Sequence, residues 1–152
     1  MASFADALDT NVADIEAAPS QPVGTYLWEI YKDFEIKDRG EDWEVISFPI
    51  KCVSAEDDVD PDELEEFGSV TGEVQRYEFM SPKEPGVEGE RKRQNTRNQI
   101  KKFCLDVLQL PDEGSLKDLM SAAKGSQFLA QVSHREYNGE IQIDVKRGMP
   151  AD

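Results

Sequence analysis

Apolar and polar residues alternate with a period of two in two runs between residues 23 and 53. This pattern predicts two β-strands, each with one face toward a core. The apolar positions of the two runs are Tyr26, Trp28, Ile30, Phe34 and Ile36, then Ile46, Phe48, Ile50 and Cys52. Lys32 interrupts the first run, so we expect a bulge or bend near Tyr31 and Lys32. Pro49 has no N–H to donate and is expected at a strand edge or bulge.

Three further strands are predicted. One spans Glu73–Met80, where Tyr77 and Phe79 share one face, but the pattern does not show which face is buried. The other two form a hairpin with alternating apolar residues at 128–132 and 141–145. Asn138-Gly139 joins them, and this dipeptide favours a tight turn because both residues tolerate positive φ.

A helical pattern separates the two groups of strands. Apolar residues recur at the helical spacing i, i+3, i+4, i+7 and i+8, namely at Ile100, Phe103, Cys104, Val107 and Leu108. Thr96 and Gln99 form a capping-box pattern, which predicts the helix start, and Pro111 predicts its end. Ser115 and Asp118 predict the start of a second, shorter helix, for which Gly125 is a natural end. The preceding stretch 81–94 contains two Pro and two Gly residues and is expected to be a mobile loop.

Three strands, helices and two strands follow one another in the order of an OB-fold. We therefore expect a mainly β protein with some helix, a five-stranded OB-fold barrel with helices between strands 3 and 4. The second arrangement that fits is an open antiparallel sheet with helices on one face. Residues 23–150 would form the domain, 1–22 an acidic flexible arm, and 54–72 an acidic insertion. Within the insertion a short helix beginning at Pro61 is conceivable, but a solvated loop is expected for most of it.

The charge of the 152-residue chain is unevenly distributed. Its formal net charge is -15, which by itself argues against a nucleic-acid partner. Thirteen acidic residues lie in two segments without Lys or Arg, four in 1–22 and nine in 54–73; without these thirteen the net charge is −2. The body is therefore nearly neutral, and it carries a basic cluster around residues 91–102.

Cations and aromatic rings are the side chains that a single-strand binder needs, for phosphates and for stacking bases. The candidate cations are Arg91, Lys92, Arg93, Arg97 and Lys101, with Arg76, Lys32, Arg135 and Lys146 on predicted strands. The candidate aromatic residues are Tyr31, Trp43, Tyr77 and Tyr137. The competing interpretation is a solvated helix face for the cluster and core packing for each ring.

Catalytic and metal-binding patterns are not found in the sequence. His134 is the only histidine, and no Cys spacing suits a metal. Cys52 and Cys104 fall on apolar faces, where buried free thiols are expected. No run of residues approaches membrane-spanning length. We expect a non-enzymatic, cytoplasmic protein without cofactor or metal.

Four short stretches resemble a family of phage and prophage proteins of replication and recombination gene sets, often labelled single-stranded-DNA-binding. They are Gly24-Thr25-Tyr26, Ser47-Phe48-Pro49-Ile50, Lys102-Phe103-Cys104 and Lys124-Gly125-Ser126-Gln127-Phe128-Leu129-Ala130. The resemblance covers roughly Val23–Pro150, and the insertion at 54–72 looks longer than the family's loop. It implies an OB-fold that coats single-stranded DNA in the cytoplasm of an infected bacterium.

The acidic segments leave a second interpretation open. Replication or recombination proteins could bind to them, and an acidic protein could also mimic DNA toward a host DNA-binding protein. Mimicry needs carboxylates fixed on one rigid face, whereas the excess here lies in segments expected to be mobile. We therefore favour DNA binding, with the arm competing for the basic site, and the number of copies in the assembly stays open.

Overall fold

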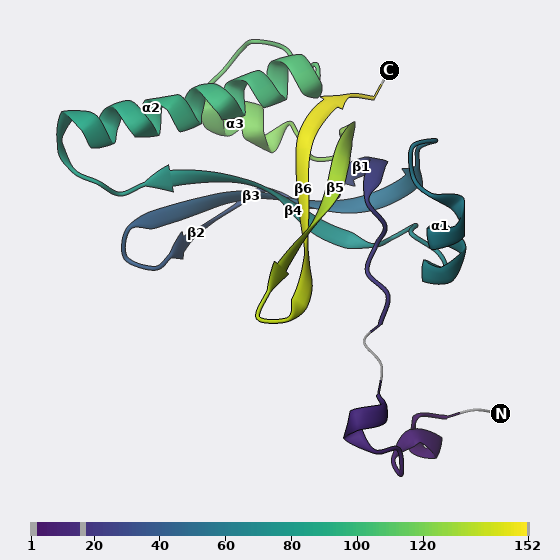
Figure 1. The fold of residues 1–152 in the computed structure, drawn as a ribbon. Coiled ribbons are helices and arrows are strands. Elements are labelled where there is room, and N and C mark those ends of the chain that lie inside the picture. Colours follow the sequence, from purple (N-terminus) through teal and green to yellow (C-terminus); the bar gives the residue numbers. More distant parts are fainter. Residues whose placement is uncertain (1–2, 16–17, 152) are drawn as a thin grey trace.

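A computed structural model describes residues 3–15 and 18–151, which build one strongly bent antiparallel sheet with helices at its surface (Figure 1). The strands are β1 Gly24–Ile30, β2 Glu35–Arg39, β3 Trp43–Ala55, β4 Val74–Pro82, β5 Gln127–Tyr137 and β6 Glu140–Pro150. The helices are α1 Pro61–Phe67, α2 Gly86–Lys102 and α3 Leu116–Ser121, with a π-helical turn η3 at Phe103–Val107. Two 3-10 turns, η1 Phe4–Ala7 and η2 Val12–Asp14, lie in the N-terminal arm.

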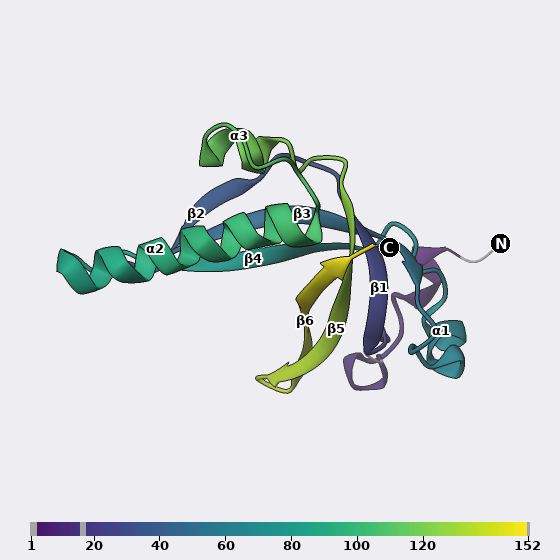
Figure 2. The same ribbon diagram turned by 90° about the horizontal axis from the view of Figure 1, so that it is seen from above.

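Strand β3 is the centre of the sheet because three strands pair with it. Strands β1 and β2 lie end to end along one edge of β3, and β4 runs along its other edge. Strand β5 pairs with the free edge of β1, and β6 pairs with β5. Seen from above, the β5–β6 hairpin projects to one side of the β2–β3–β4 layer, and α2 lies over that layer (Figure 2).

The predicted bend is confirmed at residues 31–34, where the first strand breaks into β1 and β2. Ile30 pairs with Ile50 and Glu35 with Ser47, so Pro49 faces the gap between the two strands. Its carbonyl accepts a hydrogen bond from the N–H of Tyr31 at 3.2 Å. The missing N–H of Pro49 therefore falls where the ladder is interrupted, as expected for a proline inside a long strand.

The expected closed barrel of five strands is wrong in two respects. The break makes the strands six, and in the described residues no ladder joins β4 to β6, so the sheet stays open. Across this seam the Gly148 N–H donates to the Tyr77 hydroxyl at 2.9 Å. Mainly β structure with helices is confirmed, and the open antiparallel sheet matches the second arrangement that the sequence allowed.

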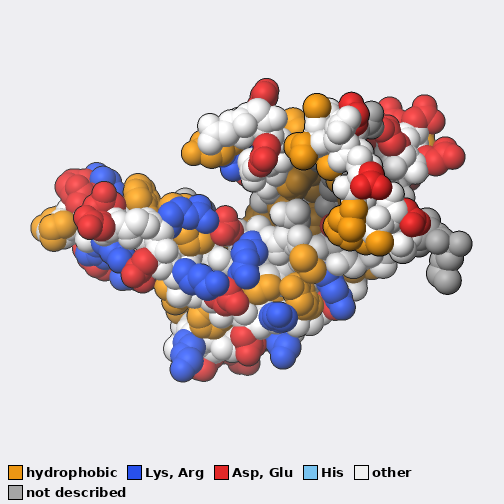
Figure 3. Space-filling view, turned by 90° about the horizontal axis from the view of Figure 1, so that it is seen from below, with side chains coloured by type: hydrophobic (Ala, Val, Ile, Leu, Met, Phe, Trp, Pro, Cys, Tyr) orange, Lys and Arg blue, Asp and Glu red, His pale blue; other side chains and the backbone are white. Residues whose placement is uncertain are grey.

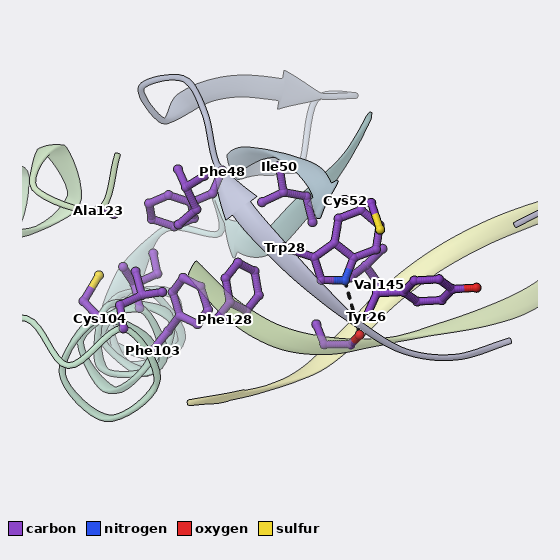
Figure 4. Packing of buried hydrophobic residues seen from close by; sticks show 14 of the residues in the cluster. Tyr26, Trp28, Phe48, Ile50, Cys52, Phe103, Cys104, Ala123, Phe128 and Val145 are labelled. Carbon is purple, nitrogen blue, oxygen red and sulfur yellow. Dashed lines mark hydrogen bonds between the residues drawn. The ribbon is translucent and has the colours of Figure 1, made fainter. Parts of the chain in front are cut away.

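The core lies between the sheet and the α2–η3 segment. Strand residues of the predicted apolar face are buried, including Trp28, Phe48, Ile50 and Phe128, whereas Ile36 is exposed. Figure 4 shows Phe103 beside Phe128, and Trp28 Nε1 donates to the Ala130 carbonyl. Both cysteines are buried free thiols, as expected, and burial raises the pKa of each to about 11.

Helix α2 begins at Gly86, ten residues before Thr96, so the Thr96 cap and most of the loop predicted at 81–94 are wrong. Thr96 instead lies inside the helix, and its hydroxyl donates to the Met80 carbonyl at 2.8 Å. Position 89 requires glycine, because a Cβ at this position would overlap the Glu84 carbonyl oxygen. Of the two glycines that suggested a loop, Gly89 allows the β4–α2 turn to approach the helix closely, and Gly86 adopts a positive φ at the helix start.

Two local predictions from the sequence are confirmed. The Ser115–Asp118 capping box starts α3, with Ser115 Oγ accepting from the Asp118 N–H at 3.1 Å. Asn138 and Gly139 form the hairpin turn between β5 and β6, both with positive φ. In each case residues close in the chain determine the local structure, so the pattern alone was sufficient.

The acidic insertion is mostly exposed but is more ordered than a solvated loop. Asp60 caps α1, and Val59 and Val70 are buried against the sheet. The Asp58 carboxylate accepts from the N–H of Thr25 at 2.9 Å and from its hydroxyl at 2.7 Å. These bonds hold the pKa of Asp58 below its usual range. The insertion is therefore anchored to the first residues of β1.

The N-terminal arm has an exposed part, residues 3–15, and a buried part at Gln21 and Pro22 next to β1. Residues 3–15 are exposed throughout, and the arm extends away from the sheet (Figure 1). Gln21 and Pro22 are buried instead: the Tyr26 hydroxyl donates to the Pro22 carbonyl at 2.7 Å, and His134 Nε2 lies 2.7 Å from the Gln21 carbonyl. The packed domain therefore includes Gln21 and Pro22. Of the expected arm at 1–22, Met1, Ala2, Glu16 and Ala17 lie outside the described residues.

Candidate nucleic-acid interface

The outer face of the β2–β3–β4 layer is the face opposite α2. Because Phe48 and Ile50 of β3 point into the core, the alternate residues of that strand point outward. On β4, Tyr77 and Phe79 pack inward, which leaves Arg76 and Glu78 on the outer face. Register places the following residues together on this face: Glu35, Lys37 and Arg39 of β2, Trp43, Val45, Ser47, Pro49 and Lys51 of β3, and Val74, Arg76, Glu78 and Met80 of β4.

Ion pairs cover the middle of this outer face. Arg76 of β4 pairs with Glu35 of β2, and Arg39 of β2 pairs with Glu78 of β4 at 3.3 Å, so both pairs span β3. Beneath them Val45 and Ser47 are each only 3% exposed, although they belong to the outer face. The hydrogen bond from Arg76 is the main cause that lowers the pKa of Glu35. Glu35 is therefore an ionised partner of Arg76 at neutral pH.

Three of the four predicted aromatic candidates lie at the surface around this face. The Tyr31 ring lies in the bend between β1 and β2, with Lys32 Nζ at 5.4 Å and Lys51 Nζ at 5.9 Å from its centroid. Trp43 is 42% exposed at the start of β3, and Tyr137 is 61% exposed at the tip of the β5–β6 hairpin. Such rings offer faces on which bases can stack, with cations beside them.

Two hollows lie along this face, and a third of about 210 Å³ between them shares Arg76 and Glu78 with one and Arg39 with the other. One of about 340 Å³ is lined by Tyr31, Pro49, Val74, Gln75, Arg76, Glu78 and Ile143. The other, of about 730 Å³, lies between Arg39 and the hairpin residues Arg135, Tyr137, Asn138, Glu140 and Gln142. We call the two hollows together the β3–β4 groove. Figure 3 views the molecule from this side and shows Lys and Arg side chains spread across the face around a hollowed centre.

The predicted cation cluster on α2 is not part of this groove, because α2 covers the opposite face of the sheet. Its cations pair with nearby acids: Arg91 with Glu88, Lys92 with Glu84, and Arg93 and Arg97 with Glu90. Arg93 also donates to the carbonyls of Pro82 and Glu84, which fastens the β4–α2 turn. Hydrogen bonding to Glu84 raises the pKa of Lys92. Lys101 is exposed further along α2 and forms no ion pair with the described residues.

Tyr77, the fourth aromatic candidate, packs inside the molecule. Its ring stacks on Phe103 with a centroid distance of 4.8 Å and an interplanar angle of 16°. The ring of Tyr77 also makes edge-to-face contacts with Phe79 and Phe128. Burial raises the pKa of the Tyr77 hydroxyl. The face of the ring that stacks on Phe103 is not available to a base.

The structure adds Lys37, Arg39 and Lys51 to the candidate site, and sequence reasoning did not select them. Of the predicted cations, Arg76 and Arg135 line the groove and Lys32 lies beside it, whereas Lys146 borders a separate hollow with Arg147. The sequence signal that could have found them is alternation. Lys37 and Arg39 are two residues apart in the second half of the first predicted strand, so their side chains point to the same face. That signal shows a common face but not that the face is concave.

Other classes of site gain no support from the described residues. Within residues 3–15 and 18–151, no three His, Cys, Asp or Glu side chains are grouped as a metal site would require. None of the described helices has the length and apolar character that a membrane crossing demands.

No protein-family model and no curated protein sequence matches this chain.

Proposed function

We propose that the protein binds and protects single-stranded DNA along the β3–β4 groove, with little sequence preference. The observation that carries the proposal is the convergence of Arg39 and Arg76 on the sheet face with Arg135 on the facing hairpin, around hollows flanked by exposed aromatic rings. Guanidinium groups bind phosphates through paired hydrogen bonds, and every base can stack on an aromatic ring. The resemblance to phage proteins supports a role in DNA replication or recombination.

The path of the chain supports an OB-fold interpretation of the same groove. If β1 and β2 are counted as one interrupted strand, the spatial order is β4, β3, β1/β2, β5, β6, with α2 between the third and fourth of these strands in sequence. OB-folds bind oligonucleotides on the face of their second and third strands, between the loop after the first strand and the final hairpin turn. Here those parts are β3, β4, residues 40–42 and the Asn138–Gly139 turn.

The direct test is a titration of a fluorescent oligo-dT with the protein at several salt concentrations, with duplex DNA beside it. Binding of the single strand should weaken steeply with salt, because each phosphate contact adds about 0.7 to the negative slope of log K against log salt. Duplex should bind weakly. Absence of binding to oligo-dT at low salt would refute the proposed function.

Two triple variants of equal charge locate the interface. Arg39→Ala, Arg76→Ala and Arg135→Ala should weaken binding and flatten the salt slope by up to about 2. The matched control removes Arg91, Lys92 and Arg97 from α2, and we expect it to retain most of the affinity. This expectation revises the prediction that the α2 cations form the phosphate track. If the α2 variant loses more affinity than the groove variant, the groove is not the interface.

A role as an acidic interaction protein or DNA mimic is the second candidate, and one observation favours it. The acids of α1 lie on an ordered helix that the Asp58–Thr25 bonds and the buried Val59 and Val70 attach to the sheet. Those carboxylates are therefore better fixed than a mobile segment would allow. If oligo-dT does not bind at low salt, this role becomes the better proposal, and capture of a basic DNA-binding protein by wild type but not by an α1 variant would support it.

A further inference from the structure

The groove arginines already have anionic partners: those of Arg39 and Arg76 come from the opposite side of β3, and Arg135 pairs with Asp144 of β6 at 3.1 Å. Arg76 pairs with Glu35 across β3, and Arg39 pairs with Glu78 across it beside that pair, with both glutamates at the register of Ser47. Lys37 also lies 3.4 Å from Glu35. The two pairs cross over the buried Val45 and Ser47. A strand of DNA that follows β3 must therefore pass over these ion pairs.

We propose that Glu35 and Glu78 occupy the phosphate positions of the empty groove, and that single-stranded DNA binds by displacing them from Arg76 and Arg39. This inference rests on the proposed function and assigns these two glutamates the role of setting its affinity. A phosphate oxygen replaces a carboxylate oxygen at the same guanidinium, so neither arginine loses its hydrogen bonds. The displaced carboxylates are then fully hydrated, since both side chains already lie at the surface.

Exposure of the pairs makes this exchange feasible. The side chains of Glu35 and Glu78 are about one-third exposed, and those of Arg76 and Arg39 about one-half. Ion pairs exposed to this degree contribute little net free energy, so breaking one costs little. The remaining effect of each glutamate is repulsion of the incoming phosphate. At about 5 Å in water two like charges repel enough to weaken binding about fourfold.

The same arrangement predicts selectivity for chains over single anions. Glu35 and Glu78 both lie at the register of Ser47, on opposite edges of β3, so the two ion pairs are neighbours. A polynucleotide carries successive phosphates and can displace both glutamates in one binding event. A mononucleotide carries one phosphate at the sugar and can displace only one. Weak binding of mononucleotides should therefore accompany tight binding of the oligomer.

The test compares glutamine variants of equal charge. Glu35→Gln with Glu78→Gln removes both groove carboxylates, and Glu88→Gln with Glu90→Gln removes two that pair with α2 cations. At low salt we expect the groove variant to bind oligo-dT on the order of tenfold more tightly than wild type, because the two effects multiply. The gain should shrink above 0.1 M salt, where screening is strong. The α2 variant should change affinity less than twofold.

A carboxyl measurement separates displacement from a general effect of charge. In wild type the Arg76 hydrogen bond holds the pKa of Glu35 low. Loss of that bond and approach of a phosphate should raise this pKa when oligo-dT binds, as followed by carboxyl NMR shifts during a pH titration. An unchanged Glu35 pKa, or equal gains in the two variants, would overturn the inference. Failure of wild type and groove variant alike to bind would instead refute the proposed function.

Discussion

Replacing Phe103 by Ala should destabilise the protein more than any other single truncation in the α2–η3 segment. Phe103 is 4% exposed, and its ring lies at the centre of an aromatic cluster. The centroid distances are 4.8 Å to Tyr77, 5.1 Å to Phe128, 5.5 Å to Phe48 and 5.6 Å to Phe79. These partners come from β3, β4 and β5, so the cavity would be lined by three paired strands.

The expected magnitude follows from this rigid lining. Truncation of Phe to Ala in a core costs about 3–5 kcal/mol, and the cost is larger where the surroundings cannot collapse. Each aromatic pair adds about 0.5–1.5 kcal/mol beyond buried area, although the pairs around one ring are not additive. We therefore expect a loss of about 4–5 kcal/mol. In a domain of this size that corresponds to a fall in Tm of about 8–20 °C.

Urea unfolding followed by tryptophan fluorescence measures this loss, since Trp28 is fully buried in the same core. The midpoint should fall while the slope m stays unchanged, as expected when only the native state is affected. Val87→Ala is the matched control, because Val87 lies on α2 and is 86% exposed; it should change stability by less than about 0.5 kcal/mol. A loss below about 1.5 kcal/mol for Phe103→Ala would refute the reasoning.

Three further outcomes are expected. Removing residues 1–18 should leave the melting temperature unchanged and strengthen oligo-dT binding several-fold at low salt. Removing residues 1–22 should lower the free energy of unfolding by about 1–3 kcal/mol, because Tyr26 loses its buried acceptor. Asp58→Asn should cost about 1 kcal/mol at pH 7. The difference from wild type should vanish as pH falls through the depressed pKa of Asp58, since the stabilisation needs the ionised form. Gly89→Ala should lower the urea midpoint by the equivalent of about 1–3 kcal/mol, because the added methyl group overlaps backbone; an unchanged midpoint would contradict this.

Strand burial could be predicted from the sequence because alternation is a local property. Tyr26, Trp28, Phe48 and Ile50 are buried as their spacing indicates. The start of α2 could not be read in the same way, since the glycine and proline signals at 82–89 also suit a tight approach of the β4–α2 turn to the helix. Whether a glycine marks a loop or a close contact depends on residues that are distant in sequence.

The candidate site shows the same limit more strongly. Arg91 and Lys92 are prominent in the sequence because they are adjacent, yet their partners Glu88 and Glu84 are also nearby and occupy them. Arg39 and Arg76 are 37 positions apart and carry no common motif. They share a face only because β2 and β4 pair with opposite edges of β3. A cationic groove made by strand pairing is a property of the register, which composition does not reveal.

The open seam between β4 and β6 has a mechanical consequence. One wall of the groove belongs to β4 and the other to the β5–β6 hairpin, and across the seam the described contacts include the Gly148–Tyr77 hydrogen bond. Without a ladder, side-chain packing sets the spacing of the walls, and packing yields to small displacements more readily than a row of backbone bonds. Amides on the facing edges of β4 and β6 should therefore exchange with deuterium earlier than those between β1 and β5. If the groove binds single-stranded DNA as proposed, a variable width would let it take purines and pyrimidines alike.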